Sequence, residues 1–371
     1  MPEVNRGPIT PIEWVKRGAC SDILSIPRAR RLLRAAGIAV QIVLSLLVLA
    51  ACSRTESPTA TVERAISTPV QLPTETVSES TEPAPTAAPT VEATRTATAT
   101  VSPPLLFDGE SAFAILLDQM EMGPRWPDSE GHKMVGDYII ERLQEEGWSV
   151  EEQLFPYQGL TGRNIIARKN AGSGPTIMIG AHYDSRKVAD QSPNTSDPVP
   201  GANDGASGVA VLLELARTLE LDETPNEIWL TFFDLEDQGS GGMPDFNYIA
   251  GSSYMAENLQ ILPEAMVLVD MIGDADQQLY YEGNSNPELR ETIWQIADAL
   301  RYSDFFIKEV NHTMLDDHLP FGQLGIPAVD IIDFDYPYWH TVDDTADKVS
   351  PESLERVGRT LEQWIENKQL Q

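Results

Sequence analysis

The sequence is poor in cysteine, in basic residues and in long apolar runs. Its 371 residues include two cysteines, Cys20 and Cys52, so no disulfide can form within the chain after residue 52. Lys and Arg number 26 against 57 Asp and Glu, for a net charge of −31. This balance argues against nucleic-acid binding, which requires a basic surface. It is compatible with cationic partners such as peptide amino groups.

The longest apolar run, Ala35–Ala51, is interrupted by Gln41 and Ser45 and follows a group of arginines. It ends in Leu49-Ala50-Ala51-Cys52, which resembles a bacterial lipoprotein cleavage box. We therefore predict that residues 1–52 are a signal and lipoprotein segment, with lipid on Cys52 anchoring the exported protein to the outer face of a membrane in the bacterial cell envelope. An uncleaved anchor is the alternative, because the run is near the lower limit for spanning a bilayer.

Residues 53–104 contain no aromatic side chain and are rich in Thr, Pro, Ala, Ser and Glu. Such a composition cannot bury enough apolar surface to offset chain entropy, which predicts a disordered linker. The folded domain is expected over residues 105–371.

Within residues 105–371, patterns typical of strands alternate with patterns typical of helices. Short apolar runs predict buried strands, and apolar residues at helical spacing predict helices. This alternation favours an α/β fold with a mixed, mostly parallel twisted sheet covered by helices on both faces. We expect strands at 148–156, 164–168, 176–180, 227–234, 265–271 and 328–332, and helices at 111–120, 129–146, 206–219, 287–300 and 351–368.

Acidic residues and histidines recur at the ends of these strands. His182 follows the run at 176–180, and Asp204 lies in the glycine-flanked turn GANDGASG before a helix. Glu236 and Asp237 follow EIWLTFF, Asp270 follows AMVLV, and His340 follows the last strand. Because ligands bind beyond the carboxyl ends of such strands, these side chains are expected in one crevice. Nitrogen and oxygen donors without thiolates suit catalytic Zn²⁺.

Six motifs in order, GAHYDSR, GANDGASGVAVLLELAR, FFDLED, LVDMIGD, DDHLPF and WHTVDD, resemble the zinc aminopeptidase and glutaminyl cyclase family. The resemblance covers essentially all of residues 105–371. It implies a catalytic base at Glu236. It also implies metal ligands at the positions His182, Asp204, Asp237, Asp270 and His340.

Trp339 before His340, the DDHLPF run and GSSYMA resemble glutaminyl cyclases more closely, especially bacterial cyclases related to the animal type. That resemblance implies a glutaminyl-peptide cyclotransferase, an acyltransferase that converts N-terminal glutamine to pyroglutamate and releases ammonia. It implies one zinc at Asp204, Asp237 and His340, and Trp339 in the substrate pocket. Glu236 would move protons, supported by Asp270 and Asp316, while His182 and Asp270 are candidates for a second metal.

Two other functions stay open. A two-zinc aminopeptidase uses the same ligand residues, and a non-catalytic binding domain would be expected to have lost Glu236. The chain also departs from the vertebrate cyclases: Asp237 replaces Glu, Asp330 replaces His, and no tryptophan follows Glu236-Asp237. The missing aromatic residue leaves substrate preference open.

The remaining polar and aromatic residues receive structural interpretations. His132 is expected at the surface, His318 in a local hydrogen bond, and Asp184 beside His182, which it orients. Asp343, Asp344 and Asp347 are expected to cap the final helix or face solvent. Core or rim positions are expected for Trp126, Trp148, Trp229 and Trp294.

Overall fold

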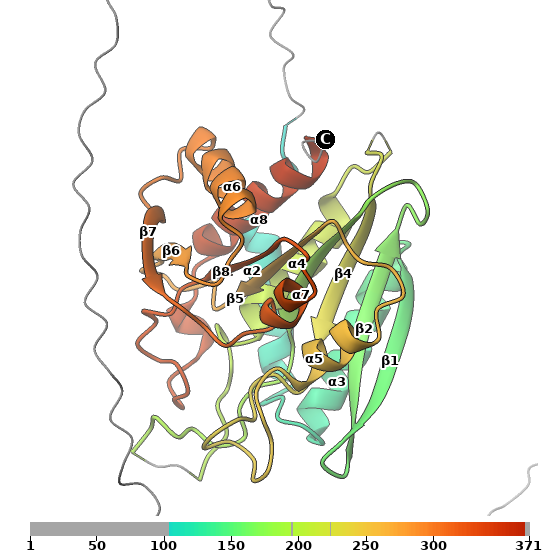
Figure 1. Cartoon of the computed structure of the whole chain (residues 1–371). Coiled ribbons are helices and arrows are strands. Elements are labelled where there is room, and N and C mark those ends of the chain that lie inside the picture. Colours follow the sequence, from blue (N-terminus) through green and yellow to red (C-terminus); the bar gives the residue numbers. More distant parts are fainter. Residues whose placement is uncertain (1–103, 194–195, 223, 368–371) are drawn as a thin grey trace, which may run out of the picture. The chain divides into compact units, whose positions relative to one another are not determined.

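The computed structural model describes residues 104–193, 196–222 and 224–367, so the predicted signal segment and nearly all of the predicted linker lie outside the described residues. A six-stranded sheet crosses the described part in the order β1-β2-β4-β3-β5-β8 (Figure 1). Strands β3, β4, β5 and β8 run parallel, whereas β1 and β2 pair in antiparallel fashion. The predicted mixed, mostly parallel sheet is confirmed. The strands are β1 (Ser149–Tyr157), β2 (Leu160–Lys169), β3 (Thr176–His182), β4 (Glu227–Phe233), β5 (Ala265–Asp270) and β8 (Ala328–Ile332).

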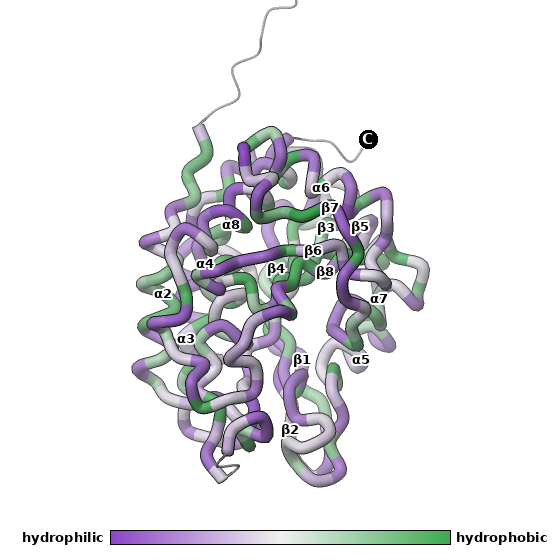
Figure 2. The backbone as a smooth tube through the Cα atoms, turned by 90° about the vertical axis from the view of Figure 1, so that its left-hand side faces the viewer, coloured by the Kyte–Doolittle hydropathy of each residue, from purple (hydrophilic) through white to green (hydrophobic). Residues whose placement is uncertain are grey.

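Helices cover both faces of this sheet, as predicted. One face carries the larger core, where α4 packs on the central strands and is itself covered by α2 and α8. The other face carries a smaller core beneath the short helices α5 and α7 (Figure 2). The helices of the first face are α2 (Gly109–Glu121), α3 (Glu130–Glu145), α4 (Ala206–Thr218), α6 (Pro287–Ala299) and α8 (Pro351–Glu366), and those of the second are α5 (Ala250–Glu257) and α7 (Leu319–Gln323).

The sequence of each central strand explains its place between two layers. Every residue of β3 and of β4 is buried. Successive side chains of a strand point to opposite faces, so Ile177 and Ile179 enter the larger core and Met178 the smaller one. Strands covered on both faces read as continuous apolar runs, which is the pattern seen here.

Five elements were missing from the sequence prediction. These are the two short helices α5 and α7, the parallel pair β6 (Leu279–Glu282) and β7 (Phe306–His312), and the single 3-10 turn η1 (Ala346–Lys348). Gly251, Ser252 and Ser253 make α5 a weak helix former by propensity, so tertiary packing must stabilise it. The four residues of β6 are too few to establish a strand periodicity.

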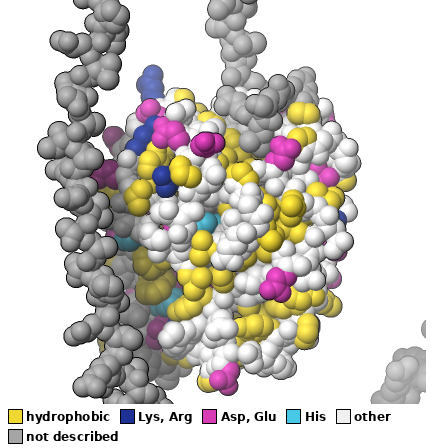
Figure 3. Space-filling view, in the orientation of Figure 1, with side chains coloured by type: hydrophobic (Ala, Val, Ile, Leu, Met, Phe, Trp, Pro, Cys, Tyr) yellow, Lys and Arg dark blue, Asp and Glu magenta, His cyan; other side chains and the backbone are white. Residues whose placement is uncertain are grey.

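The surface of the described part agrees with the acidic composition. On the face drawn in Figure 3, few Lys and Arg side chains lie among scattered acidic and hydrophobic ones. Within the residues that the structure describes, no helix combines the length and apolar character that crossing a bilayer requires.

Candidate metal centre and catalytic pocket

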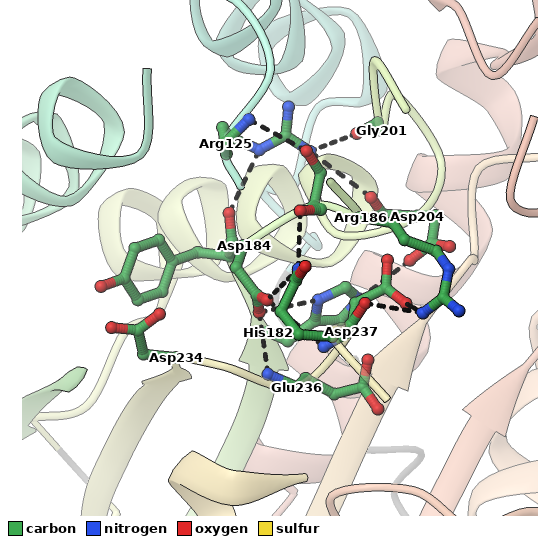
Figure 4. Close-up of polar contacts among 12 residues, drawn as sticks. Arg125, His182, Asp184, Arg186, Gly201, Asp204, Asp234, Glu236 and Asp237 are labelled. Atoms are coloured by element: carbon green, nitrogen blue, oxygen red, sulfur yellow. Dashed lines mark hydrogen bonds and ion pairs between the residues drawn. The ribbon is translucent and has the colours of Figure 1, made fainter. Parts of the chain in front are cut away.

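The parallel strands bring the sequence-predicted site residues to one edge of the sheet. His182 is the last residue of β3, and Asp270 is the last residue of β5. Glu236 and Asp237 follow β4, and Asp204 directly precedes the turn into α4. His340 lies in the loop between β8 and α8. The expectation that these residues meet beyond the carboxyl ends of the strands is confirmed. Figure 4 shows four of them, His182, Asp204, Glu236 and Asp237.

Left-handed backbone turns redirect the chain where these residues leave the strands. Leu235, before Glu236, has φ of 60°, and Met271, after Asp270, has φ of 45°. His340 itself has φ of 57°. Such values are uncommon for residues other than glycine and occur often at functional sites. After Asp204 the turn uses Gly205 (φ 98°), where a Cβ atom would lie 2.7 Å from the Asp184 carbonyl oxygen.

The site contains two overlapping groups of possible metal ligands that share Asp204. One group is Asp204, Asp237 and His340, with 3.0 Å between His340 Nε2 and Asp237 Oδ1. The other is His182, Asp204 and Asp270, in which His182 Nε2 lies 3.2 Å from Asp204 Oδ1 and hydrogen-bonds Asp270 Oδ1 at 3.1 Å. All five side chains are buried.

The donor set fits a divalent cation, and the first group fits best. Within the described part of the chain, Asp204 Oδ2 and Asp237 Oδ2 are buried without a hydrogen-bond partner. Buried carboxylates are costly unless a cation compensates them. Burial, with the nearby charge of Asp204, raises the pKa of Asp237 to about 6. A bound cation would provide a partner for the two unpartnered oxygens. It would also lower the pKa of Asp237, because it favours the ionised carboxylate.

A cavity of about 230 Å³ opens onto this cluster. Its polar end contains Asp204, Glu236, Asp237, Asp270 and His340. Apolar and aromatic side chains form its other wall, and the Trp339 ring stacks on His340 with 3.7 Å between ring centroids. Asp316, Trp339 and the predicted ligands other than His182 therefore line one space. The residues of the other wall are Tyr248, Met271, Met314, Leu315, Ile332, Phe334 and Trp339.

Glu236 lies at the polar end of the cavity and is held there by Asp184. The Asp184 carboxylate accepts hydrogen bonds from the backbone N–H groups of Glu236 (3.0 Å) and Asp237 (3.3 Å). Asp184 also lies 3.6 Å from His182 Nδ1, so it contacts that histidine as expected but chiefly fixes the exit from β4. Burial raises the pKa of Glu236 well above its ordinary value, and the charge of His182 opposes this effect.

Asp316 also lines the cavity, where the charge of Asp270 acts on its carboxyl group. Asp270 Oδ1 lies 3.1 Å from His182 Nε2, and both carboxylate oxygens of the buried Asp330 lack a hydrogen-bond partner among the described residues. Burial, together with the charge of Asp270, raises the pKa of Asp316 to about 7. The pKa of Asp330 is raised well above its usual range by burial and by Asp316.

Two residues that the sequence did not single out hold the turn that carries Asp204. Asp344 is fully buried and accepts the N–H groups of Asn203 (2.8 Å) and Asp204 (3.1 Å). The prediction that Asp344 caps the last helix or faces solvent is wrong, although Asp343 and Asp347 are exposed. Arg125 is buried too and donates to the carbonyl oxygens of Pro200 and Gly201. A charged side chain with backbone partners far along the chain leaves no local sequence signal.

His132 is buried rather than at the surface, so that prediction is also wrong. Its Nε2 lies 2.7 Å from Asp234 Oδ1, and its ring stacks on Tyr183. His318 is buried as well, 3.2 Å from Glu282 of β6, so its interaction is structural but distant in sequence. Trp148, Trp229 and Trp294 are buried, as expected for core aromatics.

Comparison with known proteins supports the resemblance of the sequence motifs to the zinc aminopeptidase and glutaminyl cyclase family. The model of peptidase family M28 matches residues 164–365, which is more than half of the chain. A Porphyromonas gingivalis glutaminyl cyclase structure is 34% identical, with a TM-score of 0.68 over 71% of this chain and 100% of that one. A Zn-dependent exopeptidase from Parabacteroides distasonis is 31% identical, with a TM-score of 0.66 over 70% and 98%.

A glutaminyl-peptide cyclotransferase of Gloydius blomhoffii is 26% identical over 284 residues, which cover 65% of this chain and 76% of that protein. The family model, these relatives and the arrangement of the site agree with the resemblance of the six sequence motifs. The chain belongs to peptidase family M28.

Proposed function

We propose that this protein is a zinc-dependent glutaminyl-peptide cyclotransferase that converts N-terminal glutamine to pyroglutamate and releases ammonia. The carrying observation is the cavity of about 230 Å³, where Glu236 and four candidate ligands meet apolar and aromatic side chains. Similarity to solved glutaminyl cyclases over nearly their whole length supports the cyclase over the peptidase activity.

The reaction needs the α-amine of glutamine to attack its own side-chain carbonyl carbon. A ring C–N bond forms, the bond to the amide nitrogen breaks, and that nitrogen leaves as ammonia. Zinc held by Asp204, Asp237 and His340 would polarise the carbonyl as a Lewis acid. Glu236 takes a proton from the amine and returns it to the departing nitrogen, which requires a carboxyl group with a raised pKa. Trp339 lines the substrate pocket beside His340.

A single zinc ion accounts best for the two groups of ligands. Asp204 Oδ2 and Asp237 Oδ2 are free for metal, as far as the described residues go. In the second group, His182 and Asp270 are already hydrogen-bonded to each other at 3.1 Å. Metal analysis tests this inference: one zinc per chain is expected, and His182→Ala should retain it. Two tightly bound ions, one of them lost in His182→Ala, would favour the aminopeptidase.

The reaction itself is tested by incubating the zinc-loaded protein with Gln-initiated and Leu-initiated peptides and weighing the products. The expected result is loss of one ammonia from the Gln peptide with the chain intact, and no change in the Leu peptide. A shortened chain from either peptide would establish a peptidase instead. If neither peptide changes although zinc is bound, the non-catalytic binding domain is the remaining interpretation.

We also propose that lipid on Cys52 anchors the protein to the outer face of a membrane of the bacterial cell envelope. Support comes from the sequence alone, where Leu49-Ala50-Ala51-Cys52 ends an apolar run. Residues 53–104 would then let the catalytic domain reach the N-termini of peptides and proteins outside the cell.

A further inference from the structure

Arg186 is a fully buried cation next to the candidate zinc ligands, and the reaction leaves it without a role. Its Nη1 donates to the backbone oxygen of Asp237 (2.9 Å) and to Asp237 Oδ1 (3.3 Å). Its Nε donates to Asp190 Oδ1 at 2.8 Å, and Nη2 donates to Asp190 Oδ2 at 3.4 Å. One guanidinium group thus hydrogen-bonds the candidate ligand Asp237 through Nη1 and Asp190 through Nε and Nη2. The planar arrangement of its N–H donors allows both contacts at once.

Asp190 in turn reaches a second ligand. Its Oδ1 lies 3.2 Å from His340 Nδ1. The neighbouring backbone strengthens this contact, because Gln191 N–H donates to the His340 carbonyl oxygen at 3.2 Å. Nδ1 has no hydrogen-bond partner among the described residues, so Asp190 acts on the imidazole through its charge and its close position. The adjacent carboxylate and the backbone hydrogen bond together restrain the orientation of the ring. His340 Nε2 faces Asp237 and Asp204.

The chain of contacts from Asp237 through Arg186 and Asp190 to His340 also decides which donor atoms stay available. Asp237 Oδ1 is occupied by Arg186 and His340, while Oδ2 has no hydrogen-bond partner in the described structure. Gly241 (φ 95°) closes over the pair, since a Cβ there would lie 2.6 Å from Asp190 Oδ2. The Tyr248 ring covers the guanidinium 5.6 Å away. These contacts bury the guanidinium completely and leave Asp190 partly exposed, so the ion pair lies at the border between the interior and solvent.

We infer that Arg186 and Asp190 form a bracket that positions Asp237 and His340 to bind zinc. Both are positioning residues, because they act through the ligands and not on the substrate. The inference rests on the zinc site proposed above, but it assigns these two residues a role that neither the ligand set nor the reaction gives them.

The direction in which Arg186→Ala changes zinc affinity distinguishes positioning of the ligands from a simple charge effect. If Arg186 acted only as a nearby positive charge, Arg186→Ala would make the site more acidic and tighten zinc binding. If Arg186 aligns the ligands, the same change weakens binding, by about 10–100-fold as for other outer partners of metal ligands. We expect weakening, measured as zinc affinity by competition with a chromophoric chelator.

Three further variants sharpen the test. Asp190→Ala should weaken zinc binding to a similar degree, and because Asp190 is partly exposed it is the safer variant if Arg186→Ala does not fold. Arg186→Lys keeps the charge but loses the fork, so it should lose most of the affinity. The double variant of Arg186 and Asp190 should be no weaker than either single one, because residues of one unit are not additive.

Arg168→Ala is the matched control, since Arg168 also pairs with a carboxylate, Glu151, and covers an aromatic ring, Trp229. It lies on β2 and should leave zinc affinity unchanged. Replacing zinc by Co²⁺ adds a readout of ligand geometry: the visible spectrum should change in Arg186→Ala and Asp190→Ala but not in Arg168→Ala.

The bracket is refuted if folded Arg186→Ala or Asp190→Ala binds zinc as tightly as the parent protein, or more tightly, with an unchanged Co²⁺ spectrum. Additive losses in the double variant would also contradict a single unit. A parent protein that binds no zinc would instead refute the proposed function, so the two failures are distinguishable.

Discussion

At the scale of single residues, the site concentrates buried carboxyl groups whose charge must be compensated. Asp204, Glu236, Asp237, Asp270 and Asp316 are all buried within one small region. Histidines, Arg186 and backbone N–H groups compensate part of this charge. Where the negative charge is not compensated, the pKa of the carboxyl group is raised. Asp316 is an example, because burial raises its pKa to about 7. Such perturbed groups in a cavity are typical of catalytic sites.

Glu236→Gln should keep the fold and the zinc but lose most of the turnover. A general acid–base group contributes on the order of 10²–10⁴-fold, and Glu236 serves two proton transfers. The rate of ammonia release from a Gln-initiated peptide measures the loss. Glu257→Gln, at an exposed position on α5, is the control. Near-normal turnover by metal-loaded Glu236→Gln would show that another group moves the proton.

The buried pair of His132 and Asp234 predicts a pH-dependent contribution to stability. Burial lowers the pKa of His132, but the charge of Asp234 and the hydrogen bond to it outweigh burial, so the pKa is raised. The pair therefore stabilises the fold fully below the unfolded pKa of about 6.5, and the effect is lost as pH rises through the folded pKa.

His132→Gln tests that sign. The difference in free energy of unfolding between parent and variant should be largest near about pH 6 and should shrink as the solution becomes alkaline. Urea unfolding of the metal-free proteins at several pH values measures it. A difference that stays constant with pH, or grows toward alkaline pH, would contradict the assignment of a charged His132.

At the scale of elements, the site residues outside the strands lie in loops that distant side chains contact. Asp344 holds the turn before α4, Asp184 holds the exit from β4, and Asp190 contacts the loop of His340. Asp344 and Asp184 accept backbone N–H groups, which would otherwise be buried without partners. The strands supply a rigid edge, and these contacts give the loops their shape.

Asp344→Ala should destabilise the protein through the turn before α4. It removes the acceptor of two buried N–H groups, at a cost of about 1–3 kcal/mol for each group left unpaired. Asp344→Asn retains one acceptor oxygen and should cost less. Denaturant unfolding of the metal-free proteins measures both. Equal stability of the parent and Asp344→Ala would show that the turn finds other partners.

At the scale of the whole molecule, zinc should couple the site to the stability of the domain. Asp204 and Asp237 have unpartnered carboxylate oxygens in the described structure, and metal would bind them only in the folded state. At a free zinc concentration 100 times the dissociation constant, such binding stabilises by about 2.7 kcal/mol.

Chelation should therefore lower the melting temperature and abolish turnover, and added zinc should restore both. Asp237→Ala, which lacks a ligand, should respond little to either treatment. If neither chelator nor added zinc changes the melting temperature of the parent protein, no metal is bound at these ligands.

Anchoring also belongs to the whole chain. The protein isolated from bacterial cells is expected to begin at Cys52 and to carry lipid there, because Cys52 ends the Leu-Ala-Ala-Cys run. Mass analysis of the mature N-terminus decides this, with Cys52→Ser as the control that should carry no lipid. A chain that starts upstream of Cys52, or is unmodified there, would contradict the prediction.

The sequence by itself determined the six-stranded sheet, the five longer helices and the residues at the strand ends. Continuous apolar runs such as 176–180 and 265–271 belong to strands covered on both faces, and this pattern is local. The placement of His182, Asp204, Glu236, Asp237, Asp270 and His340 in one crevice followed, because parallel strands end at a common edge.

Only the tertiary structure decided which residues support that crevice. Arg186 reaches Asp237 51 positions away, and Asp344 reaches Asp204 140 positions away. His132 reads as a surface residue at a helix start, yet it pairs with Asp234 102 positions along the chain. Propensity and periodicity act over a few residues, whereas a buried ion pair depends on which segments the fold brings together. The strand ends were therefore predictable, and the side chains that hold them in place were not.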